Sequence, residues 1–195
     1  KTLRGSHDRS EAKQALHVVN AWANQVNFCL GQVSVDSKSN EIPAVRELLE
    51  IINLKGAVVT ADAMHCQKKT AQTIIEQKAD YILQVKDNQS TLLKQIVEIY
   101  DRYAEDNYRS QRVRQCSKSE TNRDREETRT CMVAPAPAKL KEQWQGLQTI
   151  GLMLRTRQTL DGKRSEEISY FISSLPPRVR DHMKHVRTHW SIENS

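Results

Sequence analysis

The chain has 195 residues, of which 37% are hydrophobic and 28% charged, with only 6 glycines and 5 prolines. This length suffices for one large domain or a domain with an inserted lobe, and the composition excludes collagen-like and low-complexity proteins. No apolar run approaches the roughly 18 residues of a membrane span, so we expect a soluble protein. The formal net charge of +6 suggests a polyanionic partner.

The chain has four cysteines and no C-x-x-C motif: Cys29, Cys66, Cys116 and Cys131. This pattern favours reduced thiols in a cytoplasmic protein over a disulfide framework, although Cys116 and Cys131 could face each other across a hairpin. The chain starts at Lys1 without a Met and stops at Ser195, directly after a strongly patterned segment. We therefore expect a piece of a longer protein.

The first half of the chain alternates between strand and helix patterns. Residues 15–36 are predicted to form two strands joined by a turn at 24–27, because Val33 and Val35 alternate with polar residues. A helix, a strand, a helix, a strand and a helix are then predicted over 41–56, 57–64, 67–80, 81–87 and 90–106. Such alternation predicts an α/β sheet with some parallel strands linked by helical crossovers.

The second half is richer in β patterns. Large apolar side chains are few between 108 and 130, where seven Lys and Arg accompany four acids. We expect a polar hairpin or loop there, standing off the core. A second hairpin is predicted over 149–176, with the turn at 161–163, and a final helix over 178–195.

Two acids have positions suited to chemistry. Asp62 follows a predicted buried strand, at the sheet edge where ligand groups usually lie in α/β folds. A carboxylate there either binds a cation or hydrogen-bond donors, or caps the following helix. Glu193 lies near the helix face that carries Val186 and Trp190, and either points toward the sheet or is an ordinary surface group. Together the two acids could hold Mg²⁺, which prefers carboxylate oxygens.

Three histidines, His182, His185 and His189, fall on roughly one face of the last helix. Two turns of one helix do not easily bring three imidazoles around one ion, which argues against a zinc site. We expect these rings to form a polar cationic side that faces solvent or phosphate, together with the basic residues Arg178, Arg180, Lys184 and Arg187. The three tryptophans are expected in the core. No Walker, G-x-G-x-x-G, G-x-S-x-G or H-E-x-x-H motif is present, which removes most nucleotide-binding and hydrolase classes.

Six blocks carry a family resemblance that covers essentially the whole chain: KTLRGS (1–6), VDSKSNEIPAV (35–45), TADAMHCQK (60–68), ILQVKDNQ (82–89), SYFISSL (169–175) and HWSIEN (189–194). In this order they resemble bacterial insertion-sequence transposases of the ISAs1 group. That group includes the H-repeat-associated proteins and is allied to the IS4-like DDE transposases.

The resemblance implies an α/β, ribonuclease-H-like fold with a mixed sheet flanked by helices. It also implies an Asp-Asp-Glu triad that binds two Mg²⁺ or Mn²⁺ ions and cuts and joins DNA phosphodiesters. By motif, Asp62 is the second Asp and Glu193 is the Glu. The first Asp would lie just upstream of Lys1. Because a two-metal site needs its bridging carboxylate, we expect this piece alone not to cut DNA.

The same resemblance divides the chain into a ribonuclease-H-like core over 1–107, a β-rich insertion over 108–175 and a final core helix over 176–195. There are two departures near the glutamate, one of which is that the Lys following it in the IS4-like signature would lie past Ser195. The other is that the IS4-like enzymes have a Tyr and an Arg seven and four positions before the glutamate, where this chain has Val186 and His189. Phosphate positioning by that arginine is therefore in doubt.

DNA is the expected partner, and the transposition complex could contain a homodimer. Asp36 also ends a predicted strand and is a candidate further site carboxylate. The candidate contacts to DNA phosphates are Lys1, Arg4, Lys86, Arg187 and His189. Two other functions stay open: a non-catalytic DNA-binding protein descended from a transposase, and a plain metal-dependent nuclease.

Overall fold

The computed structural model of the chain describes residues 17–23, 28–35, 41–109, 112–122, 125–159 and 161–192. Four predicted site residues, Lys1, Arg4, Asp36 and Glu193, lie outside these ranges, as does the predicted turn at 24–27. In the part of the chain that is described, no helix is both long enough and apolar enough to cross a membrane.

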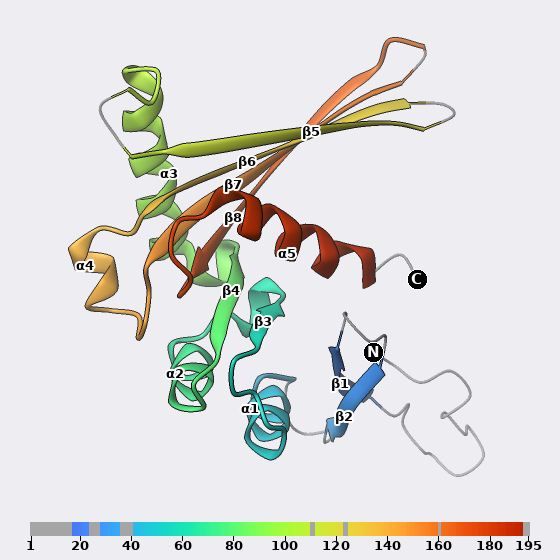
Figure 1. Ribbon diagram of the computed structural model, residues 1–195, viewed down its shortest axis with the longest axis vertical. Helices are drawn as coiled ribbons and strands as arrows, with labels where there is room; N and C mark the ends of the chain where they lie inside the picture. Colours follow the sequence, from blue (N-terminus) through green and yellow to red (C-terminus); the bar gives the residue numbers. More distant parts are fainter. Residues whose placement is uncertain are drawn as a thin grey trace.

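The described strands form a small sheet and a large one (Figure 1). The antiparallel pair β1 (His17–Ala23) and β2 (Phe28–Val35) is the small sheet. The large sheet contains β3 (Val58–Ala61), β4 (Asp80–Val85), β5 (Arg114–Asn122), β6 (Arg125–Pro135), β7 (Thr149–Thr159) and β8 (Arg164–Ser173). Its spatial order is β3-β4-β8-β7-β6-β5. β3 and β4 pair in parallel, as predicted for a helical crossover, and the other neighbours pair antiparallel.

The helices are α1 (Glu41–Ile51), α2 (Lys68–Glu76), α3 (Ser90–Glu105), α4 (Ala138–Lys141) and α5 (Val179–Ile192). The predicted helices over 41–56 and 67–80 are confirmed but end earlier. Gly56, at φ +75°, lies in the turn after α1, and Lys78, at φ +60°, lies in the turn after α2. Left-handed backbone of this kind is incompatible with a continuing right-handed helix.

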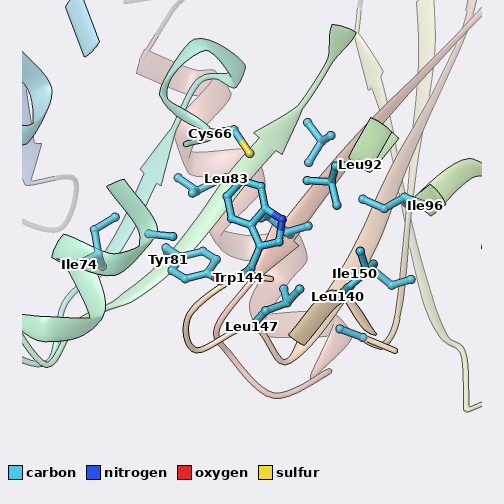
Figure 2. Close-up of a cluster of buried hydrophobic side chains, with 14 of the residues drawn as sticks. Cys66, Ile74, Tyr81, Leu83, Leu92, Ile96, Leu140, Trp144, Leu147 and Ile150 are labelled. Atoms are coloured by element: carbon cyan, nitrogen blue, oxygen red, sulfur yellow. The ribbon is translucent and has the colours of Figure 1, made fainter. Parts of the chain in front are cut away.

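Apolar side chains cover both faces of the large sheet. On one face, α1, α2 and α3 contribute to a cluster around the buried Trp144 (Figure 2), which includes Leu83, Ile96 and Ile150. On the other face, α5 packs Val186 into a smaller cluster, whose sheet members are Ile82, Cys131, Val133, Met153 and Phe171. The predicted core position is confirmed for Trp144 and wrong for Trp22, which is 45% exposed.

The segment 108–130 corrects one expectation. It contributes to a hairpin, β5–β6, as predicted, but the hairpin does not stand off the core. Within the segment, β6 pairs with β7, and Glu127 and Thr130 are buried, at 2% and 9% exposed. Cys116 and Cys131 are register partners across the hairpin, as predicted, and both are free thiols.

One of the charged residues in this segment, Glu127, is buried. Such charges are the reason why the sequence predicts a surface hairpin or loop here. Glu127 is only 2% exposed and is surrounded by Arg129, Arg155 and Arg157. Arg155 donates two hydrogen bonds to it, from Nε at 2.9 Å and from Nη2 at 3.1 Å. Burial alone would raise the pKa of Glu127, but the three arginines outweigh it and hold the pKa below its usual value.

Replacing Glu127 tests how much this network stabilises the sheet. Glu127→Gln should lower the free energy of unfolding at neutral pH by about 2 kcal/mol, less than the roughly 3–5 kcal/mol of a fully buried pair because the arginines keep some solvent. Glu167→Gln is the matched control, since its carboxylate also pairs with Arg155 but is 68% exposed. Urea denaturation of the chain measures both. Equal losses of unfolding free energy in the two variants would show that the buried network stabilises the sheet no more than an exposed ion pair does.

Helix α5 is held on the sheet partly by an uncharged histidine. His182 is fully buried and stacks on Phe171, with ring centroids 5.6 Å apart. Its Nδ1–H donates to the carbonyl of Arg178 at 3.0 Å, while Nε2 is buried without a hydrogen-bond partner among the described residues. Burial lowers the pKa of His182, so the ring is neutral near pH 7.

This burial predicts a pH-dependent stability. The folded pKa lies below the unfolded value of about 6.5, so the unfolded chain binds the proton more readily and stability falls as the pH drops through that value. Burial lowers the pKa of His65 and His185 as well, with the same sign. The unmodified chain should lose unfolding free energy as the pH falls from about 7.5 to 5.5. In His182→Phe this loss should be smaller by about 1 kcal/mol. An unchanged pH profile in the variant would contradict this.

Candidate functional site

Asp62 lies at the carboxyl end of β3, where the parallel pair β3–β4 opens to the edge of the sheet. Its neighbour Ala61 is paired with Leu83 of β4. Asp62 occupies the N-cap position of the short 3₁₀ helix η1 (Ala63–His65), yet its side chain makes no capping hydrogen bond. The capping alternative is therefore wrong. The carboxylate is 55% exposed and is available to groups from other elements.

The partner of Asp62 comes from the last helix. His189 Nε2–H of α5 donates to Asp62 Oδ1 at 2.9 Å, across 127 positions of sequence. The other ring nitrogen, Nδ1, forms a hydrogen bond with Thr60 Oγ1 at 3.2 Å. Thr60 and Asp62 share one face of the chain because strand side chains alternate, and α5 packs on that face. Thr60 of β3 and Asp62, which follows this strand, therefore both orient one imidazole.

The electrostatics keep Asp62 ionised. The hydrogen bond from His189 lowers the pKa of Asp62 most, burial raises it, and the charges of His189, His65 and Lys86 lower it further. The net shift is downward, so the group is a carboxylate at neutral pH. An ionised carboxylate suits a metal ligand and not a proton donor.

Side-chain hydrogen bonds fix the loops that carry this site. After β4, Asn88 donates to the carbonyl of Ala63 at 2.6 Å, and Gln89 donates to the carbonyl of Cys66 at 2.9 Å. These bonds tie the 3₁₀ helix η2 (Asp87–Gln89) to the backbone immediately after Asp62. The position of the carboxylate is thus set by both loops as well as by β3.

The residues predicted to contact phosphates lie at different places in the structure, some near Asp62 and some not. Lys86 is exposed at the end of β4, close enough for its charge to act on Asp62. Arg187 instead forms an ion pair with Glu120 of β5 at 2.5 Å. Lys1, Arg4 and the acids Glu193 and Asp36 lie outside the described residues.

The histidine face of α5 corrects a second expectation. His182 is 0% exposed, so it does not belong to a cationic side facing solvent. His189 lies on Asp62 and Thr60. Sequence reasoning missed Thr60. Its two-residue spacing from Asp62 within a strand is the signal that places both side chains on one face.

A divalent cation fits Asp62 by its chemistry, because Mg²⁺ and Mn²⁺ are bound mainly through oxygen ligands such as carboxylates. Within the ranges that the structure describes, no three His, Cys, Asp or Glu side chains come close enough together to hold an ion. Of the two predicted metal ligands, Asp62 lies within these ranges. Glu193 is the first residue after the last range.

Comparison with known proteins decides the family. The model of the transposase DDE domain family matches residues 1–195, the full chain. The chain belongs to this family. The resemblance identified from the six sequence blocks is thereby confirmed at the level of a DDE transposase, and the mixed α/β sheet flanked by helices is consistent with the ribonuclease-H-like fold expected for such a domain.

The DDE domain also resembles curated bacterial proteins. It is 38% identical to "Putative transposase YncI" of Escherichia coli O157:H7, over all of this chain and 50% of that protein. It is 34% identical to "H repeat-associated putative transposase YhhI" of Escherichia coli strain K12, over all of this chain and 52% of that protein. The chain thus spans about half the length of these relatives. No solved structure matches it.

Removing the imidazole tests the site geometry in the DDE domain. His189→Leu should raise the pKa of Asp62 toward its ordinary value, because the hydrogen bond from His189 is the largest cause of the lowered pKa. Thr60→Val is the control, since it removes the bond to Nδ1 and leaves Nε2 free to donate to Asp62. A carboxyl ¹³C NMR titration measures both. The assignment fails if His189→Leu leaves the Asp62 titration in place.

Proposed function

We propose that this DDE domain is part of a transposase that cleaves and joins DNA phosphodiesters with two divalent metal ions. The observation that carries the proposal is the ionised Asp62 carboxylate at the end of β3, in contact with the helix whose sequence leads to Glu193. The family match supports a transposase domain. The two-metal chemistry is the part that requires an experiment.

In this proposal Asp62 and Glu193 are metal ligands. Glu193 follows His189 by four positions, the spacing at which helical side chains share one face. His189 touches Asp62, so this spacing is the reason to expect Glu193 near the same carboxylate. Bound Mg²⁺ or Mn²⁺ would activate the attacking water or hydroxyl and stabilise the leaving oxygen. The residues of the chain hold and orient the carboxylates for that purpose.

We propose that the first Asp of the triad lies upstream of Lys1 in the parent protein, and that the chain alone is inactive for that reason. The sequence block at the start of the chain supports this placement. We also propose that the parent belongs to the ISAs1 group and acts on DNA in the cytoplasm, in a complex that contains a homodimer. In this assignment β5 to β8 form the β-rich insertion between the core and α5.

One observation favours a second function, a DNA-binding protein that has lost catalysis. His189 stands where the IS4-like signature has an arginine, and its imidazole is already bonded to the carboxylate proposed as a metal ligand. If that contact persists in the intact parent, Asp62 is less available to a metal ion. The two functions then differ in metal dependence and not in DNA affinity.

Cleavage by the full-length parent in Mg²⁺ or Mn²⁺ separates the possibilities. Asp62→Asn and Glu193→Gln should each reduce strand cleavage by about 10³-fold or more, because each removes a charged metal ligand. Asp101→Asn and Glu105→Gln, exposed on α3, are the matched controls and should cleave like the parent.

The other outcomes are equally definite. A parent protein that binds DNA but cleaves it with neither metal would establish the non-catalytic function. Cleavage without strand transfer would identify a metal-dependent nuclease. Full activity of Asp62→Asn would remove Asp62 from the catalytic site.

A further inference from the structure

A groove of about 280 Å³ lies between α5 and the β5–β6 hairpin. Its lining is formed by Cys116, Lys118, Arg129, Met153, Arg180, Met183, Lys184, Arg187 and Thr188. Of these nine described residues five are Lys or Arg, and none is acidic. Met153 and Met183 add apolar side chains to this lining. Figure 1 shows the helix running beside these long strands.

The positive charge is specific to this face of the sheet. Lys118 is the register partner of Arg129, which is in turn the partner of Arg155 on β7. On the opposite face of the hairpin, hydroxyl pairs alternate with these cations: Ser117 with Thr130 and Ser119 with Thr128. Like charges placed directly opposite each other destabilise a sheet. Within the protein this row is balanced, because Lys118 pairs with Glu120, Arg129 with Glu120 and Glu127, and Arg155 with Glu127 and Glu167.

The cations that line the groove are paired less completely than this row. Glu120 is shared by three cations, Lys118 at 3.4 Å, Arg129 at 3.3 Å and Arg187 at 2.5 Å. Arg180 and Lys184 are exposed and form no ion pair with any other described residue. The groove is thus left with a surplus of positive charge, which fits a partner that carries negative charge at regular intervals.

We propose that this groove binds the phosphate backbone of a DNA duplex whose strand extends along α5 to Asp62. The inference rests on the proposed function, and it names the surface that holds the substrate. Thr188 lines the groove and His189, the next residue, contacts Asp62, so α5 joins the two places directly. Cationic side chains contact phosphates without reading sequence, so this surface sets affinity and position.

Duplex binding by the full-length parent tests the groove, with fluorescence anisotropy over a salt series. Arg180→Ala/Lys184→Ala should weaken binding about tenfold or more near 0.1 M salt and reduce the slope of log K against log salt by about 1.8, because each lost phosphate contact removes about 0.9. Lys139→Ala/Lys141→Ala on α4 removes the same charge from exposed positions and should leave both quantities unchanged.

A third variant moves affinity the other way. Glu120→Gln removes the carboxylate that competes for three groove cations, so it should tighten duplex binding and steepen the salt dependence. A purely structural role for Glu120 would not tighten binding. Thermal melts confirm that all variants fold.

The failures are distinguishable. If Arg180→Ala/Lys184→Ala binds the duplex like the parent, or if Glu120→Gln does not tighten binding, the groove assignment is overturned while the proposed function stands. If the parent itself binds no duplex at low salt, the proposed DNA substrate and the groove fail together.

Discussion

The packing of α5 against the large sheet is the constraint on which the rest of the site depends. Val186 and the neutral ring of His182 bury one side of the helix against Ile82 and Phe171. This contact fixes the rotation of α5, and the rotation places His189 on Asp62. Without this packing, Asp62 at the end of β3 would have no hydrogen-bond partner from α5. A buried histidine that must stay neutral therefore supports the geometry of a site 7 positions further along the same helix.

The sheet supplies the second condition, a continuous surface from β3 to β5. Antiparallel pairing of β4 with β8 joins the parallel pair to the four long strands. The charges of these strands are compatible with a sheet because Glu127 neutralises arginines of β6 and β7 from a buried position. The same face then remains cationic at its outer edge, beside α5. One ion network thus stabilises the strands and leaves an excess of positive charge where the helix passes.

The sequence alone predicted most of the helices and strands, and it identified Asp62 as a candidate site residue. Periodicity located the helices and the strands, because burial on one side repeats locally, and the position of Asp62 after an apolar strand marked it as a candidate. The contact with His189 was not predictable from pattern, since 127 positions separate the partners. Burial of His182 and Glu127 was missed for a related reason: both are polar by type, and only the tertiary neighbours Phe171 and Arg155 make their burial tolerable.

Charge explains why the carboxylate of Asp62 and the cationic groove along α5 belong to one proposed site. A phosphodiester and an ionised Asp62 repel each other; two unit charges 4 Å apart interact by about 1 kcal/mol in water and about 4 kcal/mol near a protein surface. In the proposed complex, Lys and Arg along α5 and β5 would attract the backbone. A divalent ion between the backbone and the carboxylate would turn the repulsion into coordination. Without an ion, the hydrogen bond from His189 is the largest of the interactions that stabilise the charge of Asp62. Under the proposed function, metal ion and imidazole would act on the same carboxylate, of which the hydrogen bond from His189 uses one oxygen.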